Sequence, residues 1–391
     1  MPRWKYIAAA ACLAVIAPVA ALATASPNSA GKTTAGCGKG VLSTLTKRLN
    51  SYRGAPKFVP PGPAFNISKA RGKTIFNIPL FSGDTFNQTV DKAEADAAKV
   101  AGLKFVEYAN QGTPAEWVAG VNQGIAQKAD LIILEGGPDP RALAPQLAAA
   151  KKAGIPVINT HTYDTSIVKQ QLKELPNLTA SVPANFYLGS GTLTADYAMV
   201  SSNCNVDALN LEANDVQPSS AGIDARFAAE LKKWCPKTCK TSVISSAYSQ
   251  WATKATAQME SAMTKDSKIN FIAPNYDQGA IYARAAIVSA GAQNRVKIVA
   301  YNGSAPVMQL IQNKESVLVD FGEPYYWMGY SIIDEALRVL TGTKPLTNNH
   351  GPLRLWDAAN INQAGKPVSQ TKGYGPASTY VNGYKKLWGI G

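Results

Sequence analysis

The chain has 391 residues, 46% of them hydrophobic, which is enough to bury more than one core and predicts a division into two lobes. Its 39 Lys and Arg against 26 Asp and Glu give a net charge of +13. These basic residues are scattered singly or in pairs such as Lys151-Lys152 and form no long basic run, which argues against nucleic acid as a partner. Attraction to an anionic envelope surface is the better interpretation of the excess charge.

The amino end of the chain predicts export. Arg3 and Lys5 precede an apolar run over 7–23, which contains Pro18 and is shorter than the roughly 20 residues of a membrane span. Residues 1–25 are therefore predicted to be a signal peptide, and the mature protein is expected in the periplasm or associated with the cell envelope. No later segment is long and apolar enough to suggest a bilayer span.

The cysteines that follow this leader are expected to meet an oxidising compartment. Cys235 and Cys239 lie close together in a turn-forming loop, and we expect a local disulfide between them. The pairing of Cys37 and Cys204 stays open at this stage. Residues 35–37 also look like the end of a lipoprotein signal, but a polar stretch separates them from the apolar run, so a lipid anchor at Cys37 is the less favoured alternative.

Residues 26–72 are interpreted as an N-terminal arm and linker, with a helical patch over 41–52 and then a proline-rich connector. From Lys73 onward, short apolar runs alternate with helical stretches, a pattern typical of βαβ units and a parallel sheet. The strands predicted in this first half are 74–80, 104–108, 131–135 and 156–160, and the helices are 86–101, 114–128 and 141–153.

A second set of the same kind follows. Its predicted strands are 208–212, 241–247, 269–273, 297–301 and 316–321, and its predicted helices are 195–203, 222–234, 251–265, 279–290, 305–312 and 326–340. Two such halves in series predict an α/β fold with two doubly wound parallel-sheet lobes, whose strand ends meet at one crevice where open parallel sheets bind ligands. A last strand is expected near 353–357, followed by a tail wrapped on the surface.

Four short segments near strand ends carry recognisable motifs. They are Thr-Phe-Asn at 85–87, Ala-Gly-Ile-Pro-Val-Ile-Asn at 153–159, Ala-Pro-Asn-Tyr-Asp at 273–277 and Val-Ala-Tyr-Asn-Gly at 299–303. In this order, over about 73–345, they resemble the type I periplasmic solute-binding proteins of the ribose- and galactose-binding branch, which deliver ligands to ABC importers. The resemblance implies a three-stranded hinge between the lobes. It assigns 73–182 to lobe 1, completed by about 324–343, 183–323 to lobe 2, completed by about 344–361, and 362–391 to a C-terminal tail.

The resemblance also implies where ligand contacts lie. In that family, aromatic rings cover the apolar C–H face of a sugar, and planar amide and carboxylate groups hold its hydroxyls. Phe86, Trp251 and Tyr301 are expected to stack on the ligand, with ordinary core packing as the alternative for each. Asn275 is the expected polar contact, with helix capping as its alternative. The further candidates are Asp84, Asn87, Glu135, His161, Asn302 and Glu323. For the carboxylates among them, the alternative is a salt bridge at the hinge or exposure to solvent.

One departure from the family bears on the ligand. His161-Thr162 stands where the sugar receptors carry Asp-Arg, and a second pocket arginine is replaced around Ile223. Because neither Thr nor Ile can copy the paired donors of an arginine, ribose and galactose are not assumed to be the ligands. With Asp84, Glu135 and Glu323 but no pocket arginine, we expect a neutral to acidic cleft. A polyol, a cyclitol, a modified sugar or a cationic small molecule suits such a cleft better than an acid.

The motifs of catalysis are missing from the sequence. His161 and His350 are the only histidines, and neither G-x-S-x-G nor a phosphate-binding loop is present, so no enzyme activity, metal site or cofactor is expected. The sequence instead predicts a monomeric extracytoplasmic binding protein that closes on a small sugar-like or polyol ligand and delivers it to an ABC permease. Two alternatives stay open: a ligand sensor for a chemotaxis or two-component receptor, and a receptor for a non-sugar cationic or aromatic molecule.

Overall fold

The computed structural model describes residues 37–216 and 219–390. The predicted signal peptide, residues 1–25, and the first part of the N-terminal arm, residues 26–36, lie outside these residues. None of the described helices is both long enough and apolar enough to cross a membrane.

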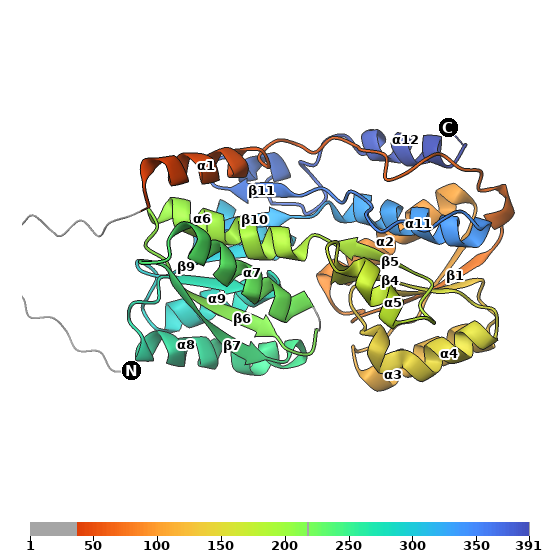
Figure 1. Cartoon of the computed structure of the whole chain (residues 1–391), viewed down its shortest axis with the longest axis horizontal. Coiled ribbons are helices and arrows are strands. Elements are labelled where there is room, and N and C mark those ends of the chain that lie inside the picture. Colours follow the sequence, from red (N-terminus) through yellow and green to blue (C-terminus); the bar gives the residue numbers. More distant parts are fainter. Residues whose placement is uncertain (1–36, 217–218, 391) are drawn as a thin grey trace, which may run out of the picture. The chain divides into compact units, whose positions relative to one another are not determined.

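Lobe 1 is built on a parallel sheet with the strand order β2-β1-β3-β4-β5 (Figure 1). Strands β3 and β4 are buried along their whole length, as expected for parallel strands covered on both faces. Helices α2, α11 and α12 cover one face, and α3, α4 and α5 cover the other. The strands are β1 (Thr74–Pro79), β2 (Lys104–Glu107), β3 (Leu131–Glu135), β4 (Val157–Asp164) and β5 (Ala180–Ala184), and the helices are α2 (Thr85–Ala101), α3 (Pro114–Ala126), α4 (Ala144–Lys152), α5 (Val168–Glu174), α11 (Tyr325–Thr341) and α12 (Ala377–Leu387).

Lobe 2 is built on a second sheet with the order β11-β10-β9-β8-β6-β7, in which only β11 runs antiparallel to its neighbour. Helices α8, α9 and α10 cover one face and α1, α6 and α7 the other. The strands are β6 (Asp207–Ala213), β7 (Lys240–Ser246), β8 (Phe271–Pro274), β9 (Lys297–Asn302), β10 (Val317–Gly322) and β11 (Arg354–Asp357), and the helices are α1 (Lys39–Asn50), α6 (Thr194–Ser201), α7 (Ser219–Trp234), α8 (Thr256–Lys265), α9 (Gln278–Ser289) and α10 (Ala305–Gln312). These two sheets confirm the predicted fold class.

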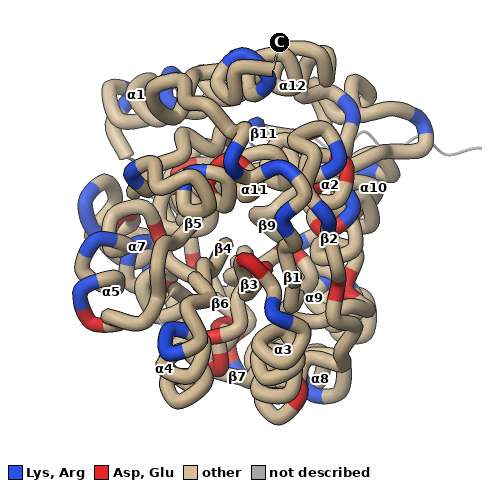
Figure 2. The backbone as a smooth tube through the Cα atoms, turned by 90° about the vertical axis from the view of Figure 1, so that its right-hand side faces the viewer, with Lys and Arg blue, Asp and Glu red and all other residues tan. Residues whose placement is uncertain are grey.

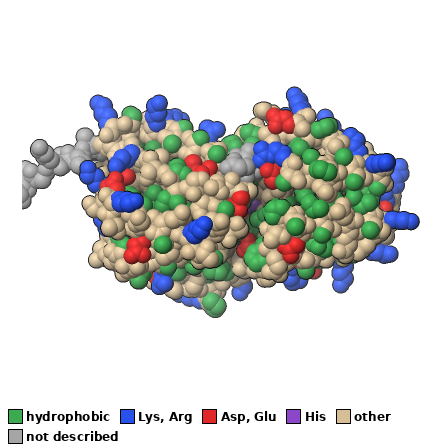
Figure 3. All heavy atoms as spheres, turned by 90° about the horizontal axis from the view of Figure 1, so that it is seen from below, with side chains coloured by type: hydrophobic (Ala, Val, Ile, Leu, Met, Phe, Trp, Pro, Cys, Tyr) green, Lys and Arg blue, Asp and Glu red, His purple; other side chains and the backbone are tan. Residues whose placement is uncertain are grey.

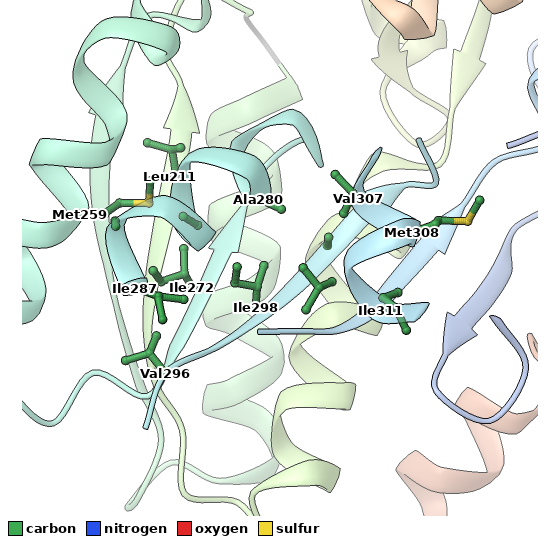
Figure 4. Close-up of a cluster of buried hydrophobic side chains, with 14 of the residues drawn as sticks. Leu211, Met259, Ile272, Ala280, Ile287, Val296, Ile298, Val307, Met308 and Ile311 are labelled. Atoms are coloured by element: carbon green, nitrogen blue, oxygen red, sulfur yellow. The ribbon is translucent and has the colours of Figure 1, made fainter. Parts of the chain in front are cut away.

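The core of lobe 2 shows how the apolar runs of the sequence become packing. Figure 4 shows Leu211, Ile272 and Ile298 interleaved with Met259 and Ile287, which come from helices. All five side chains are at most 2% exposed. Burying one such side chain contributes roughly 1.5–3 kcal/mol, so this layer holds the strand ends of lobe 2 in fixed positions.

The first helix of lobe 1 begins at the carboxyl end of β1 because of its capping residue. Asp84 is the N-cap of α2, and its carboxylate accepts a hydrogen bond from the backbone N–H of Phe86 at 3.3 Å. The same helix ends at Gly102, which has φ +77° and can therefore adopt the left-handed turn that stops a helix. These signals direct the first turn of α2, with Phe86 and Asn87, towards the space between the lobes.

The chain passes between the lobes after β5, after β10 and between α11 and β11, close to the expected hinge segments. The arm and the tail add further passages. Helix α1 packs on α6 of lobe 2, whereas the connector after it places Phe58 against Trp327 and Tyr384 of lobe 1. In the opposite direction, the tail runs from β11 of lobe 2 to α12 on lobe 1 (Figure 1).

The tail differs from the expected surface wrap. Residues 377–387 form α12, and Tyr380, Tyr384 and Trp388 are at most 7% exposed. They pack on α11 as part of the same core as the first sheet. The expectation was wrong because the glycines and prolines before the helix were taken as a sign of irregular structure. The helical spacing of the aromatic residues that follow was therefore not used.

Two disulfides are present among the described residues. Cys235 pairs with Cys239, as expected, and Cys37 pairs with Cys204, a pairing that the sequence left open. The second bond spans 167 positions and fixes the start of α1 to the end of α6.

Candidate functional site

A cavity lies where the carboxyl ends of the two sheets face each other, with about 580 Å³ of space between its walls, part of it open to solvent. It adjoins a wider mouth, with about 1610 Å³ of partly solvent-open space, with which it shares Asp84 and Tyr248, and Figure 3 shows the surface hollowed between the lobes. Lobe 1 lines the inner cavity with Leu80, Asp84, Thr85, Phe86, Asn87, Gly136 and His161, and lobe 2 with Val216, Tyr248, Tyr276, Asp277, Gln278, Asn302 and Ser304.

The lobe 1 wall is formed by the first turn of α2 and its capping residue. Asp84 points its second carboxylate oxygen towards the hydroxyl of Tyr248, at 3.5 Å across the cleft. The Asn87 amide nitrogen donates to Glu135, and among the described residues none donates to the Asn87 carbonyl oxygen, although the residue is fully buried. Asn87 therefore offers the cavity a hydrogen-bond acceptor held in place from behind.

His161 forms the floor of the cavity together with the chain that links the lobes. Its backbone has φ +52°, which is uncommon for a residue other than glycine, and Asn302 has φ +135°. The His161 Nε2 lies 2.8 Å from Glu323, and the Asn302 Nδ2 donates to the same carboxylate oxygen at 3.2 Å. Glu323 thus connects the two strained residues, one from each lobe.

The lobe 2 wall presents Asp277 between aromatic residues. Asp277 stands at the N-cap of α9, and its carboxylate accepts from the backbone N–H of Ser304 at 2.7 Å. Tyr276 precedes it, and Tyr248 packs against Trp251 with ring centroids 5.1 Å apart. This wall therefore combines one carboxylate with two phenol rings.

A run of aromatic rings crosses from one lobe to the other behind the cavity. Phe86 lies 4.7 Å from the His161 ring and 5.0 Å from Tyr325, and His161 lies 4.7 Å from Phe186, which in turn contacts Tyr276 at 5.9 Å. Such edge-to-face and tilted contacts hold rings in defined orientations. The faces offered to a ligand are therefore set before it binds.

Several of the residues expected from the sequence meet at the cavity. Asp84, Phe86, Asn87, His161 and Asn302 all line it. The expectation that they come together from the two lobes agrees with the geometry, and the site assignment as a whole stays a prediction.

Other expected contacts lie elsewhere. Asn275 is fully buried, donates to Asp224 at 2.9 Å and accepts from the N–H of Ala213, and it is absent from the cavity lining. The N-cap of α9, the alternative role weighed for Asn275, is taken by Asp277. Tyr301 is fully buried in the lobe 2 core, where its ring packs against Gly189, and is absent from the cavity lining.

Three further candidates support the wall instead of lining the inner cavity. Trp251 is 1% exposed, borders only the mouth and lies under Tyr248. Glu135 is fully buried behind Asn87. Glu323 lies behind His161 and Asn302 and bridges them at the hinge, which is close to the hinge bridging named as its alternative role.

The sequence did not single out Tyr248, Tyr276, Asp277, Gln278 and Ser304 as contacts, although all line the cavity. A signal for two of them was present, because Tyr276 and Asp277 belong to the Ala-Pro-Asn-Tyr-Asp segment. The family pattern singled out Asn275 of this segment. In this chain β8 ends at Pro274, and Tyr276 and Asp277, the two residues after Asn275, reach the cleft.

The electrostatics of the cavity are acidic. Burial raises the pKa of Asp84, and burial also raises the pKa of Asp277 to about 6, with the charge of Asp84 adding to the shift. Behind the wall, burial raises the pKa of Glu135 well above its usual range, and the charge of Asp91 adds to this. The described lining of this cavity contains no Lys or Arg.

The fold and the cleft define a two-lobed binding protein. The sequence profile of the periplasmic binding protein domain matches residues 75–344, and the chain belongs to this family. Members of this family are extracytoplasmic binding proteins and not enzymes. No curated protein matches the chain.

Several solved structures have the same fold as this chain. An ABC transporter solute-binding protein from Agrobacterium vitis, bound with alpha-D-tagatopyranose, superposes with a TM-score of 0.65 at 18% identity, covering 74% of this chain and 96% of that one. One from Bacillus halodurans C-125, with bound myo-inositol, gives 0.64 at 14% identity over 76% and 99%. The fructose-binding periplasmic domain of a hybrid two-component system gives 0.63 at 16% identity over 74% and 92%.

Proposed function

We propose that this protein is the solute-binding subunit of an ABC importer and holds a small, hydroxyl-rich ligand of the sugar or polyol type between its lobes. The observation that carries the proposal is the cavity lined from both sheets, with Phe86 and Asp84 on one side and Tyr276 and Asp277 on the other. Family membership and the sugars and polyol bound by proteins of the same fold support this ligand class.

Hinge closure is the proposed mechanism. A ligand that contacts both walls binds the closed arrangement better than the open one, and this difference in affinity shifts the population towards closure. The side chains of Phe86 and Tyr276 supply apolar faces for ring carbons, and Asn87 and Asn302 supply planar amides for hydroxyls. The closed shape is then what a membrane permease recognises.

We further infer that the protein is exported by a cleaved signal peptide and acts without a lipid on Cys37. The basic and apolar leader supports export, and the Cys37–Cys204 disulfide supports a free, unlipidated chain. A monomer is proposed, because one chain supplies both walls of the cleft.

Sensing is the second candidate function. It is favoured by the similar fold of a fructose-binding periplasmic domain that belongs to a two-component system. Uptake of labelled ligand by host cells that lack this protein separates the two functions, because loss of uptake supports import and intact uptake with a lost transcriptional response supports sensing.

Calorimetric titration with a panel of sugars and polyols tests the binding function, and small-angle scattering tests closure. We expect saturable binding of at least one member and a smaller radius of gyration in its presence. Phe86→Ala should weaken this binding at least tenfold, whereas Phe58→Ala, a half-buried phenylalanine outside the cleft, should not change it. Chemical conversion of a panel member, or equal effects of the two variants, would contradict the proposal.

A further inference from the structure

We propose that the ligand carries a positive charge next to its hydroxyls, as an amino sugar or an aminocyclitol does. The proposal rests on the binding function proposed above and narrows its ligand class. It is carried by an opposed pair of aspartates, Asp84 from lobe 1 and Asp277 from lobe 2, in a cleft whose described lining contains no Lys or Arg.

The charge of the cleft is opposite to that of the protein. The chain has a net charge of +13, and Figure 2 shows its Lys and Arg spread over the outer helices and loops. The cavity is lined by Asp84 and Asp277, and its mouth by Asp139 and Asp215. Asp139 is paired with Arg141 at 2.6 Å, whereas Asp215 accepts hydrogen bonds from the Tyr248 backbone and the Ser249 hydroxyl. A protein whose surface is basic elsewhere and acidic in the cleft favours cationic ligands over anionic ones at that cleft.

The two asparagine side chains of the cavity offer it hydrogen-bond acceptors. The Asn87 amide nitrogen is used by Glu135 and the Asn302 amide nitrogen by Glu323, so both side chains turn a carbonyl oxygen to other partners. Among the described residues, none donates to the Asn87 Oδ1. An ammonium group has three donors and no acceptor, and it therefore matches a cavity of two carboxylates and two amide oxygens.

The two aspartates repel each other unless a cation lies between them. Each occupies the amino end of a helix, α2 for Asp84 and α9 for Asp277, and a helix end supplies only about half a positive charge. Burial is the main cause of the raised pKa of Asp277, and the charge of Asp84 adds to it; the buried Asp320 behind Asp277 is coupled to the same carboxylate. A ligand ammonium removes this repulsion and stabilises the closed arrangement of the lobes.

The histidine of the cavity is already engaged by another carboxylate. The His161 Nε2 lies 2.8 Å from Glu323. The rings of Phe86, Tyr248 and Tyr276 line the same cavity, and aromatic faces attract cations as well as C–H groups. A neutral sugar satisfies the rings but leaves the opposed carboxylates without a counter-ion.

Three small probes of matched size test the charge without any stereochemistry: ethanolammonium chloride, ethylene glycol and sodium glycolate, at equal ionic strength. We expect ethanolammonium at 50 mM to raise the thermal midpoint of unfolding by several degrees, and the other two to shift it by less than one degree. The double variant Asp84→Asn, Asp277→Asn should lose the shift, and Asp139→Asn, at the mouth, should keep it.

Titration with D-glucose, D-glucosamine, D-glucuronate and the corresponding galactose set then measures the preference with ring-sized ligands. In any set that binds, the amine should bind at least tenfold more tightly than the neutral sugar, and the acid should bind least. An amine that binds no better than its neutral partner, together with equal shifts by ethanolammonium and ethylene glycol, would overturn the charge proposal while leaving the receptor function intact. Absence of binding by every sugar and polyol would count against the function itself.

Discussion

The His161 Nε2 lies 2.8 Å from a carboxylate oxygen of Glu323, although 162 positions separate the two residues. His161 interrupts the pairing of β4 with β5, and Glu323 follows β10 directly, where the chain turns into α11 of the other lobe. Asn302 of lobe 2 donates to the same oxygen. One carboxylate therefore positions a cavity residue from each lobe at the point where the lobes are linked.

Replacing this carboxylate should weaken ligand binding more than it destabilises the fold. In Glu323→Gln the amide cannot accept from both His161 and Asn302 as strongly, and we expect the dissociation constant of the tightest ligand to rise about tenfold, or ~1.4 kcal/mol. Calorimetry measures the change. Glu315→Gln removes a carboxylate paired with Arg284 on the exterior of lobe 2 and serves as the control. Equal constants for Glu323→Gln and the unmodified protein would show that the bridge does not position the cavity.

Removing the buried charge of Asp277 should stabilise the ligand-free protein. Burial raises its pKa from 3.8 to about 6, so its contribution to stability is full below pH 4 and is lost as the pH rises through 6. Asp277→Asn should therefore match the unmodified protein near pH 4 and exceed it at pH 7.5 by at most about 3 kcal/mol. Denaturant unfolding at both pH values measures this, with Asp266→Asn, at a partly exposed site, as the control. A difference of the same size at both pH values would contradict the linkage.

The two disulfides should differ in their effect on stability. The loop-closure model assigns about 5 kcal/mol to a bond spanning 167 positions, as between Cys37 and Cys204, and about 2 kcal/mol to one spanning 4, as between Cys235 and Cys239. The paired serine variants of each bond, compared by urea unfolding, measure the difference. Loss of the short bond then serves as the control for loss of the long one. A larger effect of the short bond would argue that the arm contributes little to the fold.

The C-terminal helix should be required for the stability of lobe 1. Trp388 is 1% exposed, and its indole N–H donates at 2.8 Å to Asp334, which also pairs with Arg338 at 2.9 Å. Trp388→Ala should cost about 3–5 kcal/mol, because it leaves a cavity and removes a donor from a buried carboxylate. Trp388→Phe should cost less, and Lys386→Ala on the exposed side of α12 should be near neutral. Urea midpoints compare the three, and similar midpoints for the first and last would refute the assignment.

Much of the fold could be predicted because its signals are local. Apolar runs such as 131–135 and 297–302 identify buried parallel strands, and Asp84 with Gly102 marks the limits of the helix between β1 and β2. Helix α12 was missed, since a helix whose apolar face is made of tyrosines and tryptophan after a glycine-rich stretch has no strong local signal of burial.

Less of the site could be predicted, because a side chain reaches a cleft or a core according to small differences in where a strand stops. The sequence alone predicted export, two α/β lobes, the Cys235–Cys239 pair and a cleft without a pocket arginine, since each prediction depends on residue type and spacing. The tertiary structure decided that Asn275 and Tyr301 turn into lobe 2 while Asp277 reaches the cleft, and that Cys37 meets Cys204. Those outcomes depend on contacts between segments far apart in the sequence. The free energy of packing such segments together cannot be read from any local sequence pattern.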